Sequence, residues 1–221
     1  QIGDVMRRAF HGLRNGTPGP VVVELTSDVC AADLPDAAQN YHSPKRIRQV
    51  PEPELIKAAA TALIQAKKPM IWAGGGVLFG DATDGLKELA ELTAMPVFCT
   101  MPGKSAMDET HPLCLGAGSG MTTMAAGKWL IESDCLLVLG SSLTRTPYGQ
   151  RVRGEKKVLI HITENVDDLN KVESVVIGLL GDCLLTIRAL IDQVKSQVGD
   201  KGIGNREQNK AAIAEVKQQW L

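Results

Sequence analysis

The sequence predicts a doubly wound α/β fold, in which a mostly parallel, Rossmann-like sheet carries helices on both faces and forms three layers. Short, largely apolar runs recur between residues 54 and 198, and a segment of helix length separates each run from the next. Several runs end in glycine-rich loops. The chain has 221 residues and is 44% hydrophobic, which suits one large domain with attached segments.

The first 53 residues lack this alternation. Ile2 to Arg14 has apolar residues at spacings of three and four, which is typical of an amphipathic helix, and Asn15 to Pro20 ends it. Val21 to Leu25 is rich in β-branched residues and is predicted to be a strand. Cys30 to Pro53 contains four prolines and little periodicity, so we interpret it as a linker.

The alternating region begins with a helix from Pro53 to about Ala66. Helices are also predicted at Asp84–Thr93, at Thr122–Glu132 and from an Asp182 N-cap to about Val198. The predicted strands are Met70–Ala73, Val97–Thr100, Cys135–Leu139, Lys157–Ile162 and Val175–Gly178.

The chain is predicted to close with one more helix. Gly199 to Gly204 forms a flexible joint, and Asn205 with Gln208 resembles a capping box that opens this helix. An apolar stripe of Ala212, Val216 and Trp220 requires a partner surface. Because the chain begins at Gln1 without a secretory signal, we interpret it as a piece of a longer protein.

Composition excludes several classes of function. Lys and Arg total 24 against 25 Asp and Glu, and they are scattered, which excludes a nucleic-acid stripe or a polybasic membrane anchor. No apolar run approaches the roughly 18 residues of a membrane span. The five cysteines are odd in number and include no C-x-x-C pair, which favours buried free thiols in the cytoplasm over disulfides or a metal site.

Ligands of open parallel sheets bind at the carboxyl ends of the strands, so the loops there are the candidate site. Gly74, Gly75 and Gly76 follow one strand. Two interpretations stay open, because glycine serves both: backbone N–H groups that approach a phosphate, or a tight strand-to-helix turn without a ligand. The spacing fits neither G-x-G-x-x-G nor a P-loop. Further candidates in such loops are Thr100, Gly118, Ser119, Gly140, Ser141, Ser142, Arg145, Thr163 and Glu164.

No catalytic constellation is evident. The four histidines are dispersed, and no nucleophile or general base can be named. The carboxylates of Glu164, Asp167 and Asp168 follow a strand end, where carboxylates can hold a ribose, but a solvated surface cluster is the favoured interpretation. The turn from Gly116 to Gly120 is expected to open the helix that follows it.

A series of motifs occurs along nearly the whole chain in a fixed order. They are Arg8–Phe10, Gly16–Val21, Glu24–Val29, Lys68–Gly76, Leu89–Val97, His111–Pro112, Ser133–Gly140 and Gly181–Asp182. This ordered set resembles thiamine diphosphate-dependent enzymes of the acetolactate synthase and 2-oxo acid decarboxylase family. The first three motifs resemble the end of their pyrimidine-binding domain, and the others resemble their central domain.

The resemblance implies a parent lyase or transferase that acts on 2-oxo acids by decarboxylation or carboligation. It implies residues 1–29 as the last helix and strand of the pyrimidine domain, 30–53 as a linker, 54–198 as the central domain, and 199–221 as a connection toward the diphosphate domain. The family's activating glutamate and Gly-Asp-Gly metal motif are absent here, so this piece should be inactive. Thiamine diphosphate and Mg²⁺ would be bound by other parts of a full-length homodimer or homotetramer.

Central domains of some relatives bind FAD or ADP. Carried over by residue, the flavin pattern matches Gly74 to Gly76 and Thr100. Ser142 stands where flavin-type members have arginine, and Thr163 to Asn165 stand where they have Asp-Ile-Asp. Charge-assisted contacts are worth roughly 1.5 to 3 kcal/mol each, so tight flavin binding is not expected.

Two alternatives stay open from the residues alone. An autonomous dinucleotide-binding oxidoreductase domain would carry an acidic residue about 20 positions after its glycine turn, and residues 94–96 near that spacing are Ala, Met and Pro. The second alternative is a regulatory module that binds ADP or a related nucleotide.

Overall fold

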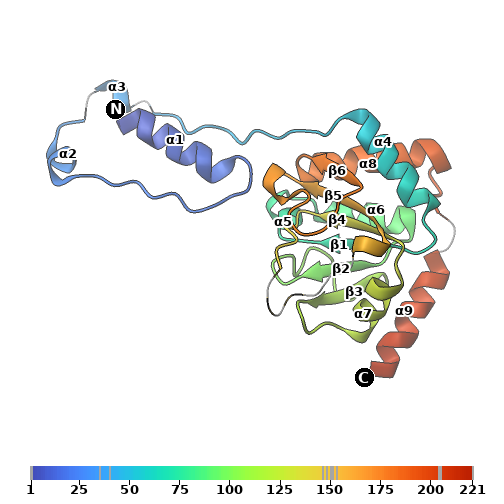
Figure 1. Cartoon of the computed structure of the whole chain (residues 1–221). Helices are drawn as coiled ribbons and strands as arrows, with labels where there is room; N and C mark the ends of the chain where they lie inside the picture. Colours follow the sequence, from blue (N-terminus) through green and yellow to red (C-terminus); the bar gives the residue numbers. More distant parts are fainter. Residues whose placement is uncertain are drawn as a thin grey trace. The chain divides into compact units, whose positions relative to one another are not determined.

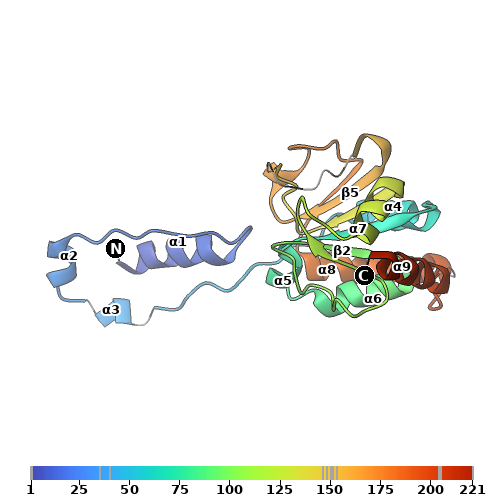
Figure 2. The ribbon, with the colours of Figure 1, turned by 90° about the horizontal axis from the view of Figure 1, so that it is seen from below.

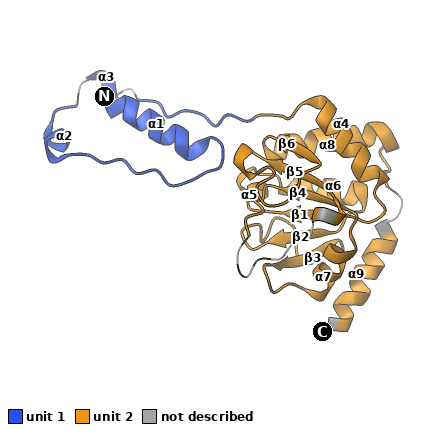
Figure 3. Cartoon of the chain, viewed as in Figure 1, with its two compact units in different colours: residues 1–48 blue, residues 49–221 orange. Residues whose placement is uncertain are grey.

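The computed structural model describes residues 2–34, 36–39, 41–145, 147, 149, 152, 154–203 and 206–220 (Figure 1). The side chains of residues 37, 39, 155, 206 and 220 are also outside this description. The chain divides into two compact units, residues 1–48 and residues 49–221 (Figure 3).

The first unit contains α1 (Ile2–Arg14) and two short helices, α2 (Ser27–Ala31) and α3 (Asp36–Gln39). The carboxamide oxygen of Asn15 accepts a hydrogen bond of 2.6 Å from the backbone N–H of Ile47, which ties the end of α1 to the far end of the unit. The ring of Phe10 lies 6.3 Å from that of Tyr41.

The predicted strand Val21–Leu25 is wrong for this structure. The segment has no regular secondary structure, and Val22 is 83% exposed. A strand requires a neighbour to complete its hydrogen-bond ladder, and the described residues of this unit include no strand. Local β propensity alone therefore did not produce a strand here.

The second unit is built on a six-stranded sheet with the order β3-β2-β1-β4-β5-β6. All neighbouring pairs run parallel. The strands are β1 (Pro69–Ala73), β2 (Val97–Thr100), β3 (Cys114–Gly118), β4 (Cys135–Leu139), β5 (Val158–Thr163) and β6 (Ile177–Leu180). The strand order reverses between β1 and β4, which is the topological switch point of the doubly wound fold.

Helices cover the sheet in two groups. They are α4 (Pro53–Gln65), α5 (Gly76–Phe79), α6 (Thr83–Thr93), α7 (Met124–Glu132), α8 (Cys183–Val198) and α9 (Arg206–Trp220), with 3₁₀ turns η1 (Gly154–Lys156) and η2 (Val166–Asp168). Helix α8 packs against both α4 and α6, and α7 packs against α9. In Figure 2, α6 and α8 lie on one side of β2 and α7 on the other. The predicted doubly wound, three-layer fold is therefore confirmed.

Burial explains why most strands could be recognised. Every residue of β1 and β4 is buried, as expected for central parallel strands with helices on both faces. The predicted burial of the thiols is confirmed for Cys99 and Cys135, and this burial raises the pKa of each to about 12.

Several element predictions need correction. The expected turn at Gly116 to Gly118 is strand β3, and β6 begins two residues later than predicted. Two members of the stripe on the last helix have a partner within the domain, because Val216 is buried in the common core and Ala212 packs against it, while the side chain of Trp220 lies outside the described residues. The predicted Asp182 cap is confirmed, since its carboxylate accepts the Leu185 N–H at 3.0 Å. The predicted Asn205 cap lies outside the described residues.

Candidate functional site

The candidate residues lie at one edge of the sheet, because parallel strands place their carboxyl ends together. Gly74 to Gly76 follow β1, Thr100 ends β2, and Gly118 ends β3 with Ser119 behind it. Gly140 to Ser142 and Arg145 follow β4, while Thr163 ends β5 and Glu164 follows it. The predicted residues therefore lie at the same edge of the sheet.

The glycines after β1 pack directly on the loop after β4. A Cβ on Gly74 would lie 2.7 Å from Ser141 Cα, and one on Gly76 would lie 2.7 Å from Gly140 Cα. The backbone N–H of Gly74 donates to Leu139 O at 2.8 Å, and that of Gly76 donates to Gly140 O at 2.8 Å. These glycines thus allow two loops to meet, and their N–H groups are already used.

The second strand joins the same cluster of loops. A Cβ on Gly103 would lie 2.8 Å from the carbonyl carbon of Gly74, and Thr100 Oγ1 accepts the Gly103 N–H at 3.2 Å. A Cβ on Gly75 would meet Pro102 O at 3.2 Å. The loops after β1, β2 and β4 therefore close on one another.

The loop after β4 has an unusual backbone. Gly140 has φ +55° and Leu143 has φ +49°, so two residues three positions apart adopt the left-handed conformation. Ser141 Oγ accepts from the indole Nε1–H of Trp72 and from the Leu143 N–H, both at 3.4 Å. The hydroxyls of Ser142 and Thr144 lie 3.0 Å apart. This loop presents hydroxyl groups at the edge of the sheet.

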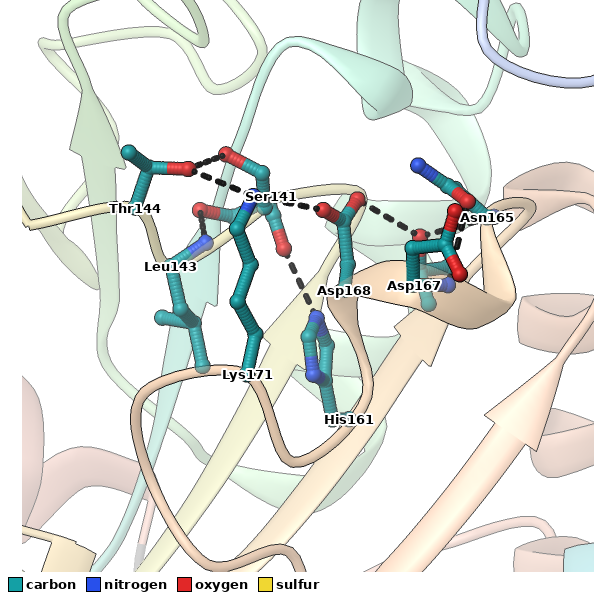
Figure 4. Close-up of polar contacts among 10 residues, drawn as sticks. Ser141, Leu143, Thr144, His161, Asn165, Asp167, Asp168 and Lys171 are labelled. Carbon is teal, nitrogen blue, oxygen red and sulfur yellow. Dashed lines mark hydrogen bonds and ion pairs between the residues drawn. The ribbon is translucent and has the colours of Figure 1, made fainter.

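His161, in the middle of β5, supports this loop from inside the protein. Its Nε2–H donates to Ser141 O at 2.7 Å (Figure 4). Burial lowers the pKa of His161 below its usual value, and the bond to Ser141 and the charge of Asp168 only partly oppose this effect. The ring is therefore neutral at pH 7 and acts as a hydrogen-bond donor.

A carboxylate lies beside the end of β5. Asp168 is 7% exposed and accepts hydrogen bonds of 3.4 Å from Thr163 Oγ1 and from Lys171 Nζ. Lys171 Nζ also donates to Thr144 Oγ1 at 3.2 Å, which connects the loops after β4 and β5. The interpretation of Asp168 as a solvated surface residue is wrong, because it is buried in this network (Figure 4).

Other candidates are not brought to the same place. Arg145 pairs with Glu173 at 3.3 Å rather than with the hydroxyls of its own loop. Gly118 ends β3 and Ser119 follows it, and β3 is three strands from β4 and therefore roughly 14 Å away at the usual spacing. The Ser119 N–H donates to Met121 O at 3.3 Å and is therefore bonded within its own loop.

Sequence reasoning missed the contribution of His161, Thr144 and Lys171, and it placed Asp168 in a solvated cluster. One signal for His161 was available in the sequence. Side chains alternate along a strand, so residues 161 and 163 lie on the same face of β5. In the described part of the chain, no three or more His, Cys, Asp and Glu residues are grouped so that they could hold a metal ion. Among the same residues, no helix combines the length and apolar character that crossing a membrane requires.

This edge of the sheet carries hydroxyl groups and an ammonium group. Among the described residues, it shows no catalytic nucleophile paired with a general base. The arrangement connects the loops after β4 and β5. The sequence matches the family described as "Thiamine pyrophosphate enzyme, central domain" over residues 56–190. The chain belongs to this family.

Relatives extend the likeness over a larger share of the chain. A probable acetolactate synthase large subunit from Methanococcus aeolicus is 32% identical over 207 residues, covering 88% of this chain and 33% of that protein. Glyoxylate carboligase from Escherichia coli O157:H7 is 30% identical over 190 residues, covering 85% of this chain and 32% of that protein. The chain thus spans about a third of the length of these relatives.

A solved structure has the same fold as this central domain. Benzoylformate decarboxylase from Polynucleobacter necessarius matches with a TM-score of 0.70 and 21% identity, over 86% of this chain and 36% of that one. At this identity the match concerns the fold alone.

Proposed function

We propose that this central domain is part of a thiamine diphosphate-dependent enzyme that acts on 2-oxo acids by decarboxylation or carboligation. The observation that carries the proposal is the family match over residues 56–190, together with relatives named as acetolactate synthase and glyoxylate carboligase. The 221 residues alone are proposed to be inactive. Thiamine diphosphate and Mg²⁺ would bind to parts of the protein outside this chain.

The proposed organisation has four parts. Residues 1–29 end a pyrimidine-binding domain, 30–53 form a linker, 54–198 form the central domain, and 199–221 lead toward a diphosphate-binding domain. The segment Val21–Leu25 supports the first part, because its residues favour a strand and the described residues of its unit include no strand that could pair with it. A homodimer or homotetramer in the cytoplasm is proposed, and free cysteines agree with that compartment.

The strand-end edge is proposed to serve as a scaffold with only weak affinity for a nucleotide. The residues do not fit a tightly held flavin diphosphate, because the N–H groups of Gly74, Gly76 and Gly140 are bonded within the protein. Lys171 and Arg145 are paired with carboxylates. We therefore propose that FAD or ADP binds, if loaded at this edge, with a Kd above roughly 100 µM, equivalent to less than about 5.5 kcal/mol.

Two experiments test the proposal. Carbon dioxide release from pyruvate and from glyoxylate would be measured with thiamine diphosphate and Mg²⁺, for the full-length protein containing this sequence and for the 221-residue chain. Turnover that depends on thiamine diphosphate is expected only for the full-length protein, and turnover by the chain alone would contradict the proposal.

Calorimetric titration of the chain with FAD, ADP and NAD tests the edge. We expect no binding in the micromolar range. Micromolar FAD or ADP would overturn the proposed weak site, whereas micromolar NAD would favour an autonomous dinucleotide-binding domain.

A further inference from the structure

The side chain of His161 is completely buried in a place where a positive charge is poorly accommodated. The residue is 0% exposed on β5, between Val138 of β4 and Gly178 of β6. Its Nε2 lies 2.7 Å from the carbonyl oxygen of Ser141. Its Nδ1 is buried and has no hydrogen-bond partner among the described residues.

These contacts determine the protonation state of the ring. A carbonyl oxygen only accepts, so Nε2 must carry the hydrogen and Nδ1 is the unprotonated nitrogen of the neutral ring. A second proton would therefore go to Nδ1. There it would create a buried N–H without an acceptor and a buried charge, both of which are costly.

The surrounding charged groups compensate for only part of that cost. On the turn after β5, the carboxylate of Asp168 attracts a protonated ring, but it is already shared between Thr163 and Lys171. Asp167 lies on the same turn, and Arg145 of the loop after β4 is paired with Glu173. Among the described residues, the neighbours of His161 on β4 and β6 are Val138 and Gly178, and neither carries a charge.

The Ser141 carbonyl is a point on which the loop after β4 depends. The hydroxyl oxygen of Ser141 also accepts hydrogen bonds from the Trp72 indole N–H and from the Leu143 N–H. The loop includes two left-handed residues, Gly140 and Leu143, so its conformation has to be maintained by such contacts. Loss of the His161 contact would free Ser141 and, with it, the hydroxyls of Ser142 and Thr144.

We propose that His161 is an acid-sensitive latch for the loop Gly140–Thr144: the neutral ring holds Ser141 in place, and the protonated ring leaves its buried position and releases the loop. The latch requires no bound nucleotide and does not depend on the proposed enzymatic activity. Acid would open this edge of the sheet while the rest of the domain stays folded.

Hydrogen exchange measured by mass spectrometry on the whole chain tests the latch. Protection of the loop Gly140–Thr144, corrected for the intrinsic pH dependence of exchange, would be followed from pH 7.5 to pH 4.5, with α4 and α8 as internal references. The titration of the His161 ring would be followed by nitrogen NMR. We expect the protection of the loop to fall by about tenfold or more as the pH is lowered, with a midpoint at the same pH as that of the ring titration. The helices α4 and α8 are expected to stay protected.

His161→Gln provides the matched variant, because its amide can donate to Ser141 O but does not titrate, and His111→Gln is the control. We expect His161→Gln to keep the loop protected at pH 4.5 and His111→Gln to behave like the unmodified chain. The proposal is overturned if the loop stays protected while the ring is protonated, if α4 and α8 open in the same step, or if His161→Gln opens with an unchanged midpoint. Should His161→Gln fail to fold, the ring titration and loop exchange of the unmodified chain still decide.

Discussion

Replacing Gly74 by alanine would separate the two loops that meet at the switch point. The added Cβ would lie 2.7 Å from both Cα and Cβ of Ser141, and the nearest atom, Gly140 O, is closer still. Two of these neighbours are backbone atoms, which cannot turn away as a side chain can. Overpacking of this kind costs typically about 1 to 3 kcal/mol.

The clash also affects hydrogen bonds. Moving the loops apart stretches the bonds from Gly74 N to Leu139 O and from Gly76 N to Gly140 O, each 2.8 Å long and each worth about 1 kcal/mol. We therefore expect Gly74→Ala to lower the free energy of unfolding by about 3 to 5 kcal/mol. For a chain of this size that is a fall in Tm of roughly 6 to 20 °C.

The assay is urea and thermal unfolding followed by circular dichroism, with two glycine variants for comparison. Gly127 lies in α7, and a Cβ there meets nothing within 4 Å, so Gly127→Ala should stabilise by about 0.5 to 1 kcal/mol through helix propensity. Gly75→Ala should fall between the two, because its Cβ would be 3.2 Å from Pro102 O. A Gly74→Ala protein within 1 kcal/mol of the unmodified chain would refute the reasoning.

Three further predictions concern single side chains and can be checked by the same unfolding measurements. Asp182→Ala removes the acceptor for the Leu185 N–H at the start of α8 and should cost about 1 to 2 kcal/mol, whereas Asp182→Asn should cost less; equal losses would contradict a capping role. Asp134→Ala removes acceptors for the N–H groups of Lys67 and Lys68, at 2.8 and 2.9 Å, and should cost about 1.5 to 3 kcal/mol, an expectation that fails if stability is unchanged. The folded-state pKa of His161 is lowered, so the contribution of its neutral ring to the free energy of unfolding is complete above about pH 6.5 and is lost as pH falls, by at most about 1.4 kcal/mol per pH unit. The free energy of unfolding of His161→Gln should lack this pH-dependent part, and identical pH profiles of the variant and the unmodified chain would argue against it.

The central strands could be predicted because they are short apolar runs that helices cover on both faces. β3 could not, because its sequence Cys-Leu-Gly-Ala-Gly contains two glycines, which strands usually disfavour. Gly116 has φ +92° within this edge strand, a conformation that explains the residue but gives no strand signal. Val21–Leu25 shows the opposite case, since its residues favour a strand that lacks a neighbour in the described chain.

The edge of the sheet at which the candidate residues lie could be predicted, but the contacts among them could not. Parallel topology alone brings the ends of β1, β4 and β5 to one edge. The burial of His161 and Asp168 depends instead on loops far apart in the sequence, and neither residue type indicates burial by itself. Hydrogen bonds that join Ser141 to His161 and Thr144 to Lys171 become visible only with the folded chain.

The glycines at this edge show how structure decides between the two roles that sequence leaves open. At a phosphate-binding turn, a Cβ would project into the space that the ligand occupies. Here a Cβ on Gly74, Gly76, Gly103 or Gly140 would instead meet protein backbone within 3.0 Å. Any anionic ligand must therefore rely on the hydroxyls and Lys171 at the rim. Because Lys171 is already bound to Asp168, a ligand would have to compete with that carboxylate, which is the physical reason to expect weak affinity.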